Sequence, residues 1–201
     1  MRIGLFGGTF DPPHLGHLIL ASECLHQLSL DRVFWILTPN PPHKHGKAIS
    51  PLGDRLAMLE AALGDDPAFT ISRVEIDRPA PHYAVDTVQI LKTQFPGDLL
   101  FYLLGGDSLR DLPTWHNPRQ FVAACDGIGV MRRPGAAIDL TALDMVLPGL
   151  VDKVHLLETP LVEISAQDIR RRISQGLPYR YFLPPPVYTW IQSHDIYRQN
   201  S

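Results

Sequence analysis

The sequence is short of cysteine, of excess positive charge and of long apolar runs. Its two cysteines, Cys24 and Cys125, form no Cys-x-x-Cys pair and are too few for a disulfide scaffold, so we expect reduced core residues. The formal net charge of −3 offers no basic footprint for a nucleic acid. No stretch reaches the ~18 apolar residues of a membrane helix, and the run before Gly7 is too short for a secretory signal. We therefore expect a cytoplasmic protein without nucleic-acid or membrane partners; a homo-oligomer stays open.

What is present indicates a folded globular chain. Hydrophobic residues make up 45% and charged residues 19% of 201 residues, which suits one α/β domain. We expect a single domain over residues 1–201, whose C-terminal part from about residue 160 carries closing helices. The chain has nineteen prolines, with clusters at 39–42, 79–81 and 184–186. These clusters predict stiff loops rather than linkers.

Short apolar runs alternate with helical patterns, which predicts a Rossmann-like, doubly wound parallel sheet with crossover helices. The continuous apolar run Leu99–Leu104 is typical of a buried central strand. The expected strands are Arg2–Phe6, Val33–Leu37, Phe69–Ile76, Leu99–Leu104, Gly127–Met131 and Val154–Leu157. The expected helices are Leu15–Leu28, Leu52–Leu63, Ala84–Phe95, Ala166–Ser174 and Val187–Ser193. Residues 136–153 carry no usable signal.

The strongest motif is GGTFDPPHLGH, from Gly7 to His17, between the first expected strand and helix. The glycine pair, expected in a turn, lets the main chain approach a phosphate, and a helix N-terminus adds unpaired N–H donors. His14 and His17, three residues apart, fall on one helix face, and Gly16 between them leaves room for a ligand. Two alternatives stay open: a Gly-rich turn with exposed histidines, or a zinc pair, although no third ligand stands at metal spacing.

A second motif, ISAQDIR, runs from Ile164 to Arg170. Ser165 is a good helix N-cap with Asp168 at the third helical position, so a capping box explains the pattern without any ligand. In partnership with the first motif, a second helix N-terminus and Arg170 predict a grip on phosphates from the opposite side.

Together these motifs resemble the signatures G-x-F-D-x-x-H-x-G-H and I-S-x-x-x-I-R of the nucleotidyltransferase superfamily. Gln167 stands where that superfamily often has Thr, which removes a hydroxyl contact to phosphate. Three further segments resemble the bacterial nicotinate-nucleotide adenylyltransferases: Thr38–Lys44, Gly105–His116 and Pro81–Thr87. A solvated loop, a turn with a capping Asp and a helix cap are their respective structural explanations.

The resemblance implies adenylyl transfer from ATP to nicotinate mononucleotide, giving deamido-NAD and pyrophosphate, with Mg²⁺ accompanying ATP. It implies no particular protein ligand for the metal. The implied catalytic residues are His14, His17 and Arg170. The implied ATP-binding residues are Gly7, Gly8, Thr9, Phe10, His14, His17, Gly106, Asp107, Arg132, Ile164, Ser165 and Arg170. The implied acceptor-binding residues are Asn40, His43, Lys44, Thr87 and Trp115.

Among these, Trp115 is expected to stack on the pyridine ring, although tryptophan is more often a core residue. Asn40, His43 and Lys44 are expected to hold the acceptor's 5′-phosphate. Other functions stay open: a transferase acting on pantetheine phosphate, nicotinamide mononucleotide or flavin mononucleotide, a non-catalytic nucleotide sensor, or a class I aminoacyl-tRNA synthetase core, which shares H-x-G-H.

Overall fold

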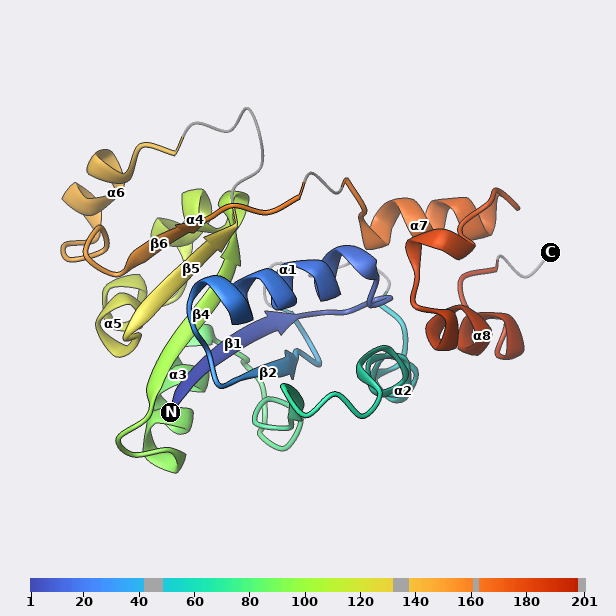
Figure 1. The fold of residues 1–201 in the computed structure, drawn as a ribbon, viewed down its shortest axis with the longest axis horizontal. Helices are drawn as coiled ribbons and strands as arrows, with labels where there is room; N and C mark the ends of the chain where they lie inside the picture. The colour runs from blue at the N-terminus through green and yellow to red at the C-terminus, as the bar shows by residue number, and fades with distance from the viewer. Residues whose placement is uncertain (42–48, 132–137, 161–162, 199–201) are drawn as a thin grey trace.

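Six parallel strands form one sheet in the order β3-β2-β1-β4-β5-β6 (Figure 1). The computed structural model describes residues 1–41, 49–131, 138–160 and 163–198. The strands are β1 (Arg2–Gly8), β2 (Arg32–Leu37), β3 (Phe69–Ser72), β4 (Leu99–Gly105), β5 (Gly127–Met131) and β6 (Val154–Leu157). This order and orientation confirm the predicted doubly wound Rossmann-like fold.

Two predicted strand ends are wrong. Gly7 and Gly8 belong to β1, paired with Ile36 and Leu37 of β2, rather than to a turn after it. β3 stops at Ser72 instead of residue 76, because the chain turns there: the Asp77 N–H donates to the Arg73 carbonyl at 2.9 Å. A backbone group used in a turn is lost to the strand ladder.

Helices cover both faces of the sheet (Figure 1). The crossover helices are α1 (Leu15–Gln27), α2 (Leu52–Leu63), α3 (Ala84–Gln94), α4 (Gly106–Asp111), α5 (Pro118–Ala124) and α6 (Leu140–Val146). Strand side chains alternate between the faces: Ile3 and Leu5 pack with α3 and α5, whereas Phe6 packs with α1 and α2. Cys24 and Cys125 are buried and unpaired, as predicted, and burial raises the pKa of each thiol to about 12.

The C-terminal part packs against α2. It comprises α7 (Ala166–Ser174), the 3₁₀ turn η3 (Arg180–Phe182) and α8 (Pro185–Ser193), at the right of Figure 1. Met58 of α2 is fully buried against Ile169, Val187 and Ile191 of this part. That contact fixes α7 near the carboxyl ends of β1 and β2.

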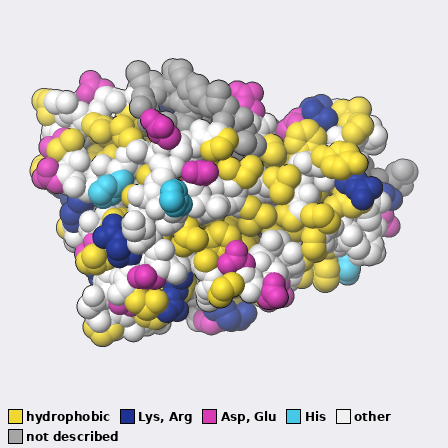
Figure 2. Space-filling view, viewed as in Figure 1, with side chains coloured by type: hydrophobic (Ala, Val, Ile, Leu, Met, Phe, Trp, Pro, Cys, Tyr) yellow, Lys and Arg dark blue, Asp and Glu magenta, His cyan; other side chains and the backbone are white. Residues whose placement is uncertain are grey.

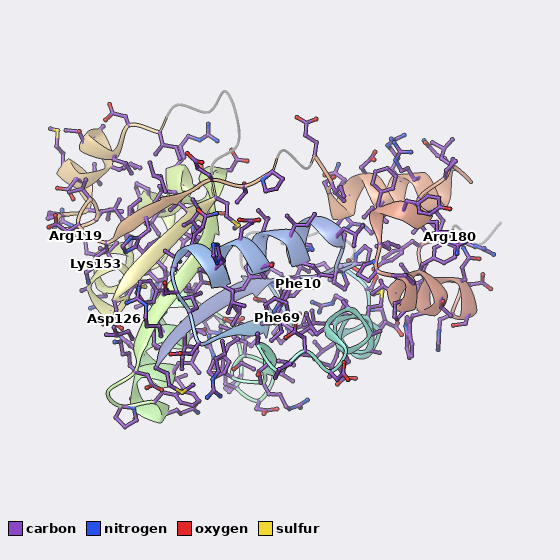
Figure 3. The ribbon with its side chains drawn as sticks, viewed as in Figure 1. Phe10, Phe69, Arg119, Asp126, Lys153 and Arg180 are labelled. Carbon is purple, nitrogen blue, oxygen red and sulfur yellow. The ribbon has the colours of Figure 1, made fainter. Side chains whose placement is uncertain are left out.

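Sequence patterns missed the short helices. These are α4, α5, α6, η3 and the 3₁₀ turn η2 (Leu112–Thr114). In the segment that carried no signal, Asp139 caps α6 by accepting the Ala142 N–H at 2.9 Å, and no residue of α6 is buried. Lys153 stabilises α5 by donating to the carbonyls of Val122, Ala123 and Cys125 at its C-terminus, at the left of Figure 3.

Apolar side chains gather on the face shown in Figure 2, between α1 and α2. A groove of about 390 Å³ lies there, lined by Leu18, Ile19, Ser22, Glu23, Ala62, Leu63, Asp66 and Phe69. None of these residues belongs to either sequence motif, so the groove is no candidate active site. Within the described ranges, no helix is long and apolar enough to cross a membrane.

Candidate active site

β1 and β4 lie side by side at the centre of the sheet, and the first motif follows β1. β1 leads to α1 on one face, and β4 leads to α4 and α5 on the other. Open α/β sheets bind ligands at the carboxyl ends of such neighbouring strands, where the connections part. The segment Gly7–His17 and the pair Gly105–Gly106 both lie at this point.

The glycine pair at the end of β1 makes room for aromatic rings. A Cβ added to Gly7 would lie 2.7 Å from the Tyr102 hydroxyl, and one added to Gly8 would lie 2.8 Å from the Phe10 ring. Both distances are too short for a real Cβ atom. Packing is therefore a sufficient reason for glycine at both positions. A phosphate contact through their N–H groups stays a prediction.

Phe10 turns the chain after β1. Its backbone is left-handed, at φ 47°, and its ring is 2% exposed. The ring packs edge-on against Phe6 and His17, with centroids 5.6 and 5.2 Å apart. Phe10 and Phe69 both contact the Trp35 ring (Figure 3). Because the ring is buried, the predicted contact of Phe10 with ATP would have to come from its main chain.

His14 and His17 lie together at the start of α1, as their spacing predicts. Their rings stack with centroids 3.6 Å apart, and the His14 N–H donates to His17 Nδ1 at 3.2 Å. His14 is 5% exposed, and its Nδ1 has no hydrogen-bond partner among the described residues. A buried polar atom without a partner is costly, which suits a position built for a ligand.

Burial lowers the pKa of His14 from 6.5 to about 4. This imidazole is therefore neutral near pH 7, so toward the predicted phosphate it offers a hydrogen-bond donor rather than a cation. Stacking at 3.6 Å also opposes a charge on both rings at once. The solvated-turn alternative is wrong for His14, because a solvated histidine would not be buried.

Gly16 brings the second motif to the first. A Cβ there would lie 3.1 Å from His14 Nδ1 and 3.6 Å from the Ile164 Cβ. Arg170 of α7 donates from Nη1 to the Asp11 carbonyl at 2.6 Å. The predicted juxtaposition of both motifs is thus present, although 159 residues separate Asp11 and Arg170.

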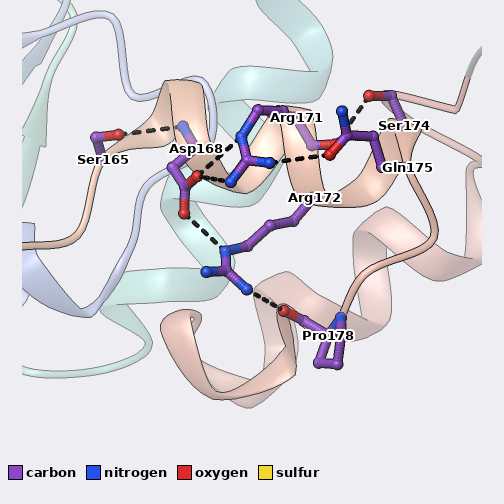
Figure 4. Close-up of polar contacts among 7 residues, drawn as sticks. All are labelled: Ser165, Asp168, Arg171, Arg172, Ser174, Gln175 and Pro178. Atoms are coloured by element: carbon purple, nitrogen blue, oxygen red, sulfur yellow. Dashed lines mark hydrogen bonds and ion pairs between the residues drawn. The ribbon is translucent and has the colours of Figure 1, made fainter.

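Ser165 caps α7, which confirms half of the predicted capping box (Figure 4). Its hydroxyl accepts the Asp168 N–H at 3.1 Å. The Asp168 carboxylate bonds Arg171 and Arg172, and these two arginines lower its pKa. As an acceptor in the cap, the Ser165 hydroxyl keeps its own proton for a ligand, so capping and phosphate binding are compatible.

Some of the predicted site residues after β4 are buried, and others are exposed. Gly106 is buried, and a Cβ there would lie 3.3 Å from the Ile138 side chain. Asp107 lies on the surface in the first turn of α4 and pairs with Arg110. Trp115 is half-buried against Tyr102 and Phe121, with centroids 6.2 and 5.2 Å away. One part of its ring therefore packs in the core while the rest faces outward.

The residues predicted for the acceptor are less uniform. Asn40 is exposed after β2, as a phosphate contact would require. Thr87 is fully buried, and its hydroxyl donates to Glu75 at 2.6 Å while accepting from Arg78 at 2.9 Å. Its side chain supports the start of α3 rather than facing solvent. His43, Lys44 and Arg132 lie outside the described residues.

Sequence patterns missed Arg55, which is 2% exposed in α2. Its guanidinium donates to four carbonyl oxygens at 2.8–3.1 Å: those of Thr9, Thr38, Pro39 and Ser50. It thereby joins the loop after β1 to the loop after β2. An arginine in an amphipathic helix gives no sign of this, except that it falls on the buried face with Leu59.

The described part of the chain holds no cluster of three His, Cys, Asp or Glu that suits a metal ion. The zinc alternative therefore finds no third ligand there. A Mg²⁺ ion fits differently, because it usually keeps several waters and is held by substrate phosphates with few protein ligands.

The chain is similar to known proteins over nearly its whole length. Residues 5–172 match the family model described as Cytidylyltransferase-like. A curated relative from Thermomicrobium roseum, named "Probable nicotinate-nucleotide adenylyltransferase", is 45% identical over 98% of this chain and 92% of its own. A relative of the same name from Thermus thermophilus is 41% identical over 98% and 100%.

The chain belongs to the nicotinate-nucleotide adenylyltransferase family. This confirms the resemblance inferred from the motifs, and the family's members are nucleotidyltransferases. A synthetase core and a transferase of another subfamily are thereby set aside.

Solved structures show the fold of the nicotinate-nucleotide adenylyltransferase family in this chain. The Plasmodium falciparum nicotinic acid mononucleotide adenylyltransferase complexed with NaAD superposes with a TM-score of 0.81, covering 98% of this chain and 97% of its own. A structure of that protein complexed with APC gives 0.77. At 16% identity, both comparisons speak for the fold alone.

Proposed function

We propose that the chain transfers the adenylyl group of ATP to nicotinate mononucleotide, giving nicotinate adenine dinucleotide (deamido-NAD) and pyrophosphate in NAD biosynthesis. One observation carries the chemistry: Arg170 of the second motif reaches the loop of the first, beside the stacked His14 and His17. Side chains able to bind phosphate thus come together from the starts of two helices, which supports the proposal. The names of the relatives supply the acceptor.

The reaction is an in-line attack by the acceptor's phosphate on the α-phosphorus of ATP, and no covalent enzyme intermediate is needed. Such a transfer depends on positioning and charge neutralisation. His14 and His17 donate hydrogen bonds to the α-phosphate and to the leaving pyrophosphate, while Arg170 holds the β- and γ-phosphates. Gly7, Gly8, Thr9 and Ser165 offer backbone or hydroxyl donors along the same line.

Mg²⁺ bound to the ATP phosphates would supply further neutralisation of their charge. The acceptor is held by the segments that follow β2 and β4, with its phosphate near Asn40 and its pyridine ring on the outward part of Trp115. Asp107 accepts hydrogen bonds from ribose hydroxyls. We further propose that the protein works in the cytoplasm, since both substrates are phosphorylated and their charges oppose membrane passage.

The test measures pyrophosphate release with ATP and Mg²⁺, comparing nicotinate mononucleotide, nicotinamide mononucleotide and pantetheine phosphate. The informative variant is His17→Asn, because an amide oxygen can still accept the His14 N–H bond while the ring is lost. We expect release with nicotinate mononucleotide, reduced about a hundredfold in His17→Asn. The matched control is His155→Asn on β6, which replaces an exposed histidine and should keep the wild-type rate. A wild type active only with another acceptor, or inactive with all three, would refute the proposal.

A further inference from the structure

Asp11 makes contacts with three distant parts of the chain, and the proposed chemistry gives it no role. It lies in the first motif, is 4% exposed, and takes three hydrogen bonds. Its carboxylate accepts from the Tyr197 hydroxyl at 2.6 Å and from the Ser50 N–H at 3.3 Å. Its carbonyl accepts from Arg170 at 2.6 Å. One residue therefore connects the motif loop to Arg170 and to Tyr197, near the end of the described residues.

Tyr197 lies just beyond α8 and contacts Asp11, 186 residues away in the sequence. Its backbone is left-handed at φ 69°, and so is that of Asp195 at φ 49°. L-residues rarely adopt this conformation, so a specific contact is needed to hold it. The buried carboxylate of Asp11 supplies that contact, and burial beside Asp11 raises the pKa of the Tyr197 hydroxyl, which stays protonated and donates.

We propose that Tyr197 is a positioning residue for ATP: its bond to the Asp11 carboxylate sets the Asp11 carbonyl, which in turn orients the Arg170 guanidinium. Tyr197 itself touches no substrate. The inference rests on the proposed role of Arg170 as a phosphate ligand. It predicts that Tyr197 influences ATP affinity and turnover through Arg170 and does not change binding of the acceptor.

A purely mechanical role is the competing explanation. The Tyr197 hydroxyl also lies 4.0 Å from Met58 Sδ, and its ring packs in the cluster formed by α2, α7 and α8. Tyr197→Phe keeps the ring and removes only the O–H donor. A mechanical anchor would respond in stability alone, whereas a positioning residue responds in ATP affinity and turnover, and only while Arg170 is present.

The experiment is a double-mutant cycle of Tyr197→Phe and Arg170→Gln. ATP affinity is measured by calorimetry without any acceptor, and kcat and KM by pyrophosphate release. Tyr181→Phe, which removes the same hydroxyl from a ring that is 84% exposed, is the matched control. We expect Tyr197→Phe to weaken ATP binding or lower kcat at least fivefold, with the KM for nicotinate mononucleotide within twofold of wild type. In the Arg170→Gln background the same change should cost less than twofold.

An unchanged ATP affinity and kcat in Tyr197→Phe, or an equal loss in both backgrounds, would overturn the inference. The calorimetric arm separates this from the proposed function. A wild type that binds ATP but releases no pyrophosphate would refute the acceptor assignment, while the coupling between Tyr197 and Arg170 would still be measured.

Discussion

Protonation of His14 should make the protein less stable in mild acid. Because burial lowers the pKa of His14 from 6.5 to about 4, the unfolded chain binds a proton at a pH where the folded chain does not. The contribution of neutral His14 to the free energy of unfolding is therefore fully present above pH 6.5, and it is lost as the pH drops from 6.5 to about 4. Below that the folded state is protonated as well, and no further loss comes from this group.

The size of the effect follows from the gap between the two pKa values. Each pH unit within it is worth about 1.4 kcal/mol, so the full loss is about 3 kcal/mol. Between pH 7 and pH 5 the same linkage gives a loss of about 2 kcal/mol. This is a large share of the ~5–15 kcal/mol by which domains are stable.

Urea unfolding at pH 7 and pH 5 measures this loss, and His14→Asn isolates it. Asparagine cannot be protonated and remains a good N-cap for α1. We expect the variant to lose about 2 kcal/mol less than wild type between the two pH values. His155→Asn is the control, since its exposed ring meets solvent in both states. Equal pH dependence in wild type and His14→Asn would refute the claim that His14 is buried in its neutral form.

Two further predictions concern packing at the site. Gly7→Ala should lower the free energy of unfolding by about 1–3 kcal/mol, and Tyr102→Phe should restore most of it, because the next Tyr102 atom lies 3.6 Å from the added Cβ; no recovery in a urea titration of the double variant would count against that contact. Arg55→Lys should cost about 3 kcal/mol or more, since one ammonium cannot satisfy four buried carbonyls. Arg119→Lys, which alters an exposed arginine, is its control, and equal losses in thermal unfolding would contradict the explanation.

Local patterns sufficed for most of the sheet and for the long helices. β2 and β5 are buried along nearly their whole length, and strands buried on both faces read as continuous apolar runs, so both could be located almost to the residue. The helices α2 and α7 were predicted with their observed bounds, because Pro51 and Ser165 mark their starts. Short helices such as α6, with no buried residue, leave no periodic signal to find.

The candidate site was only partly predictable for a related reason. His14, His17 and Gly16 are close in sequence, so their spacing alone places them together. The contacts of Arg55 with Thr9 and of Tyr197 with Asp11 span 46 and 186 residues. One sequence contains no record of such pairings, and each residue has an ordinary structural explanation where it stands.

These long-range contacts support the proposed binding of phosphates by the loop of the first motif. A glycine-containing loop loses conformational entropy when it is ordered, and a loop that orders only on binding weakens the affinity for its ligand. Here Arg55 holds the Thr9 carbonyl, Arg170 holds the Asp11 carbonyl, and Tyr197 holds the Asp11 carboxylate before any substrate is present. The loop's donors are therefore aimed in advance, which is the condition under which hydrogen bonds contribute most to phosphoryl transfer. Weakening any one of the three anchors should then lower the turnover of the molecules that stay folded.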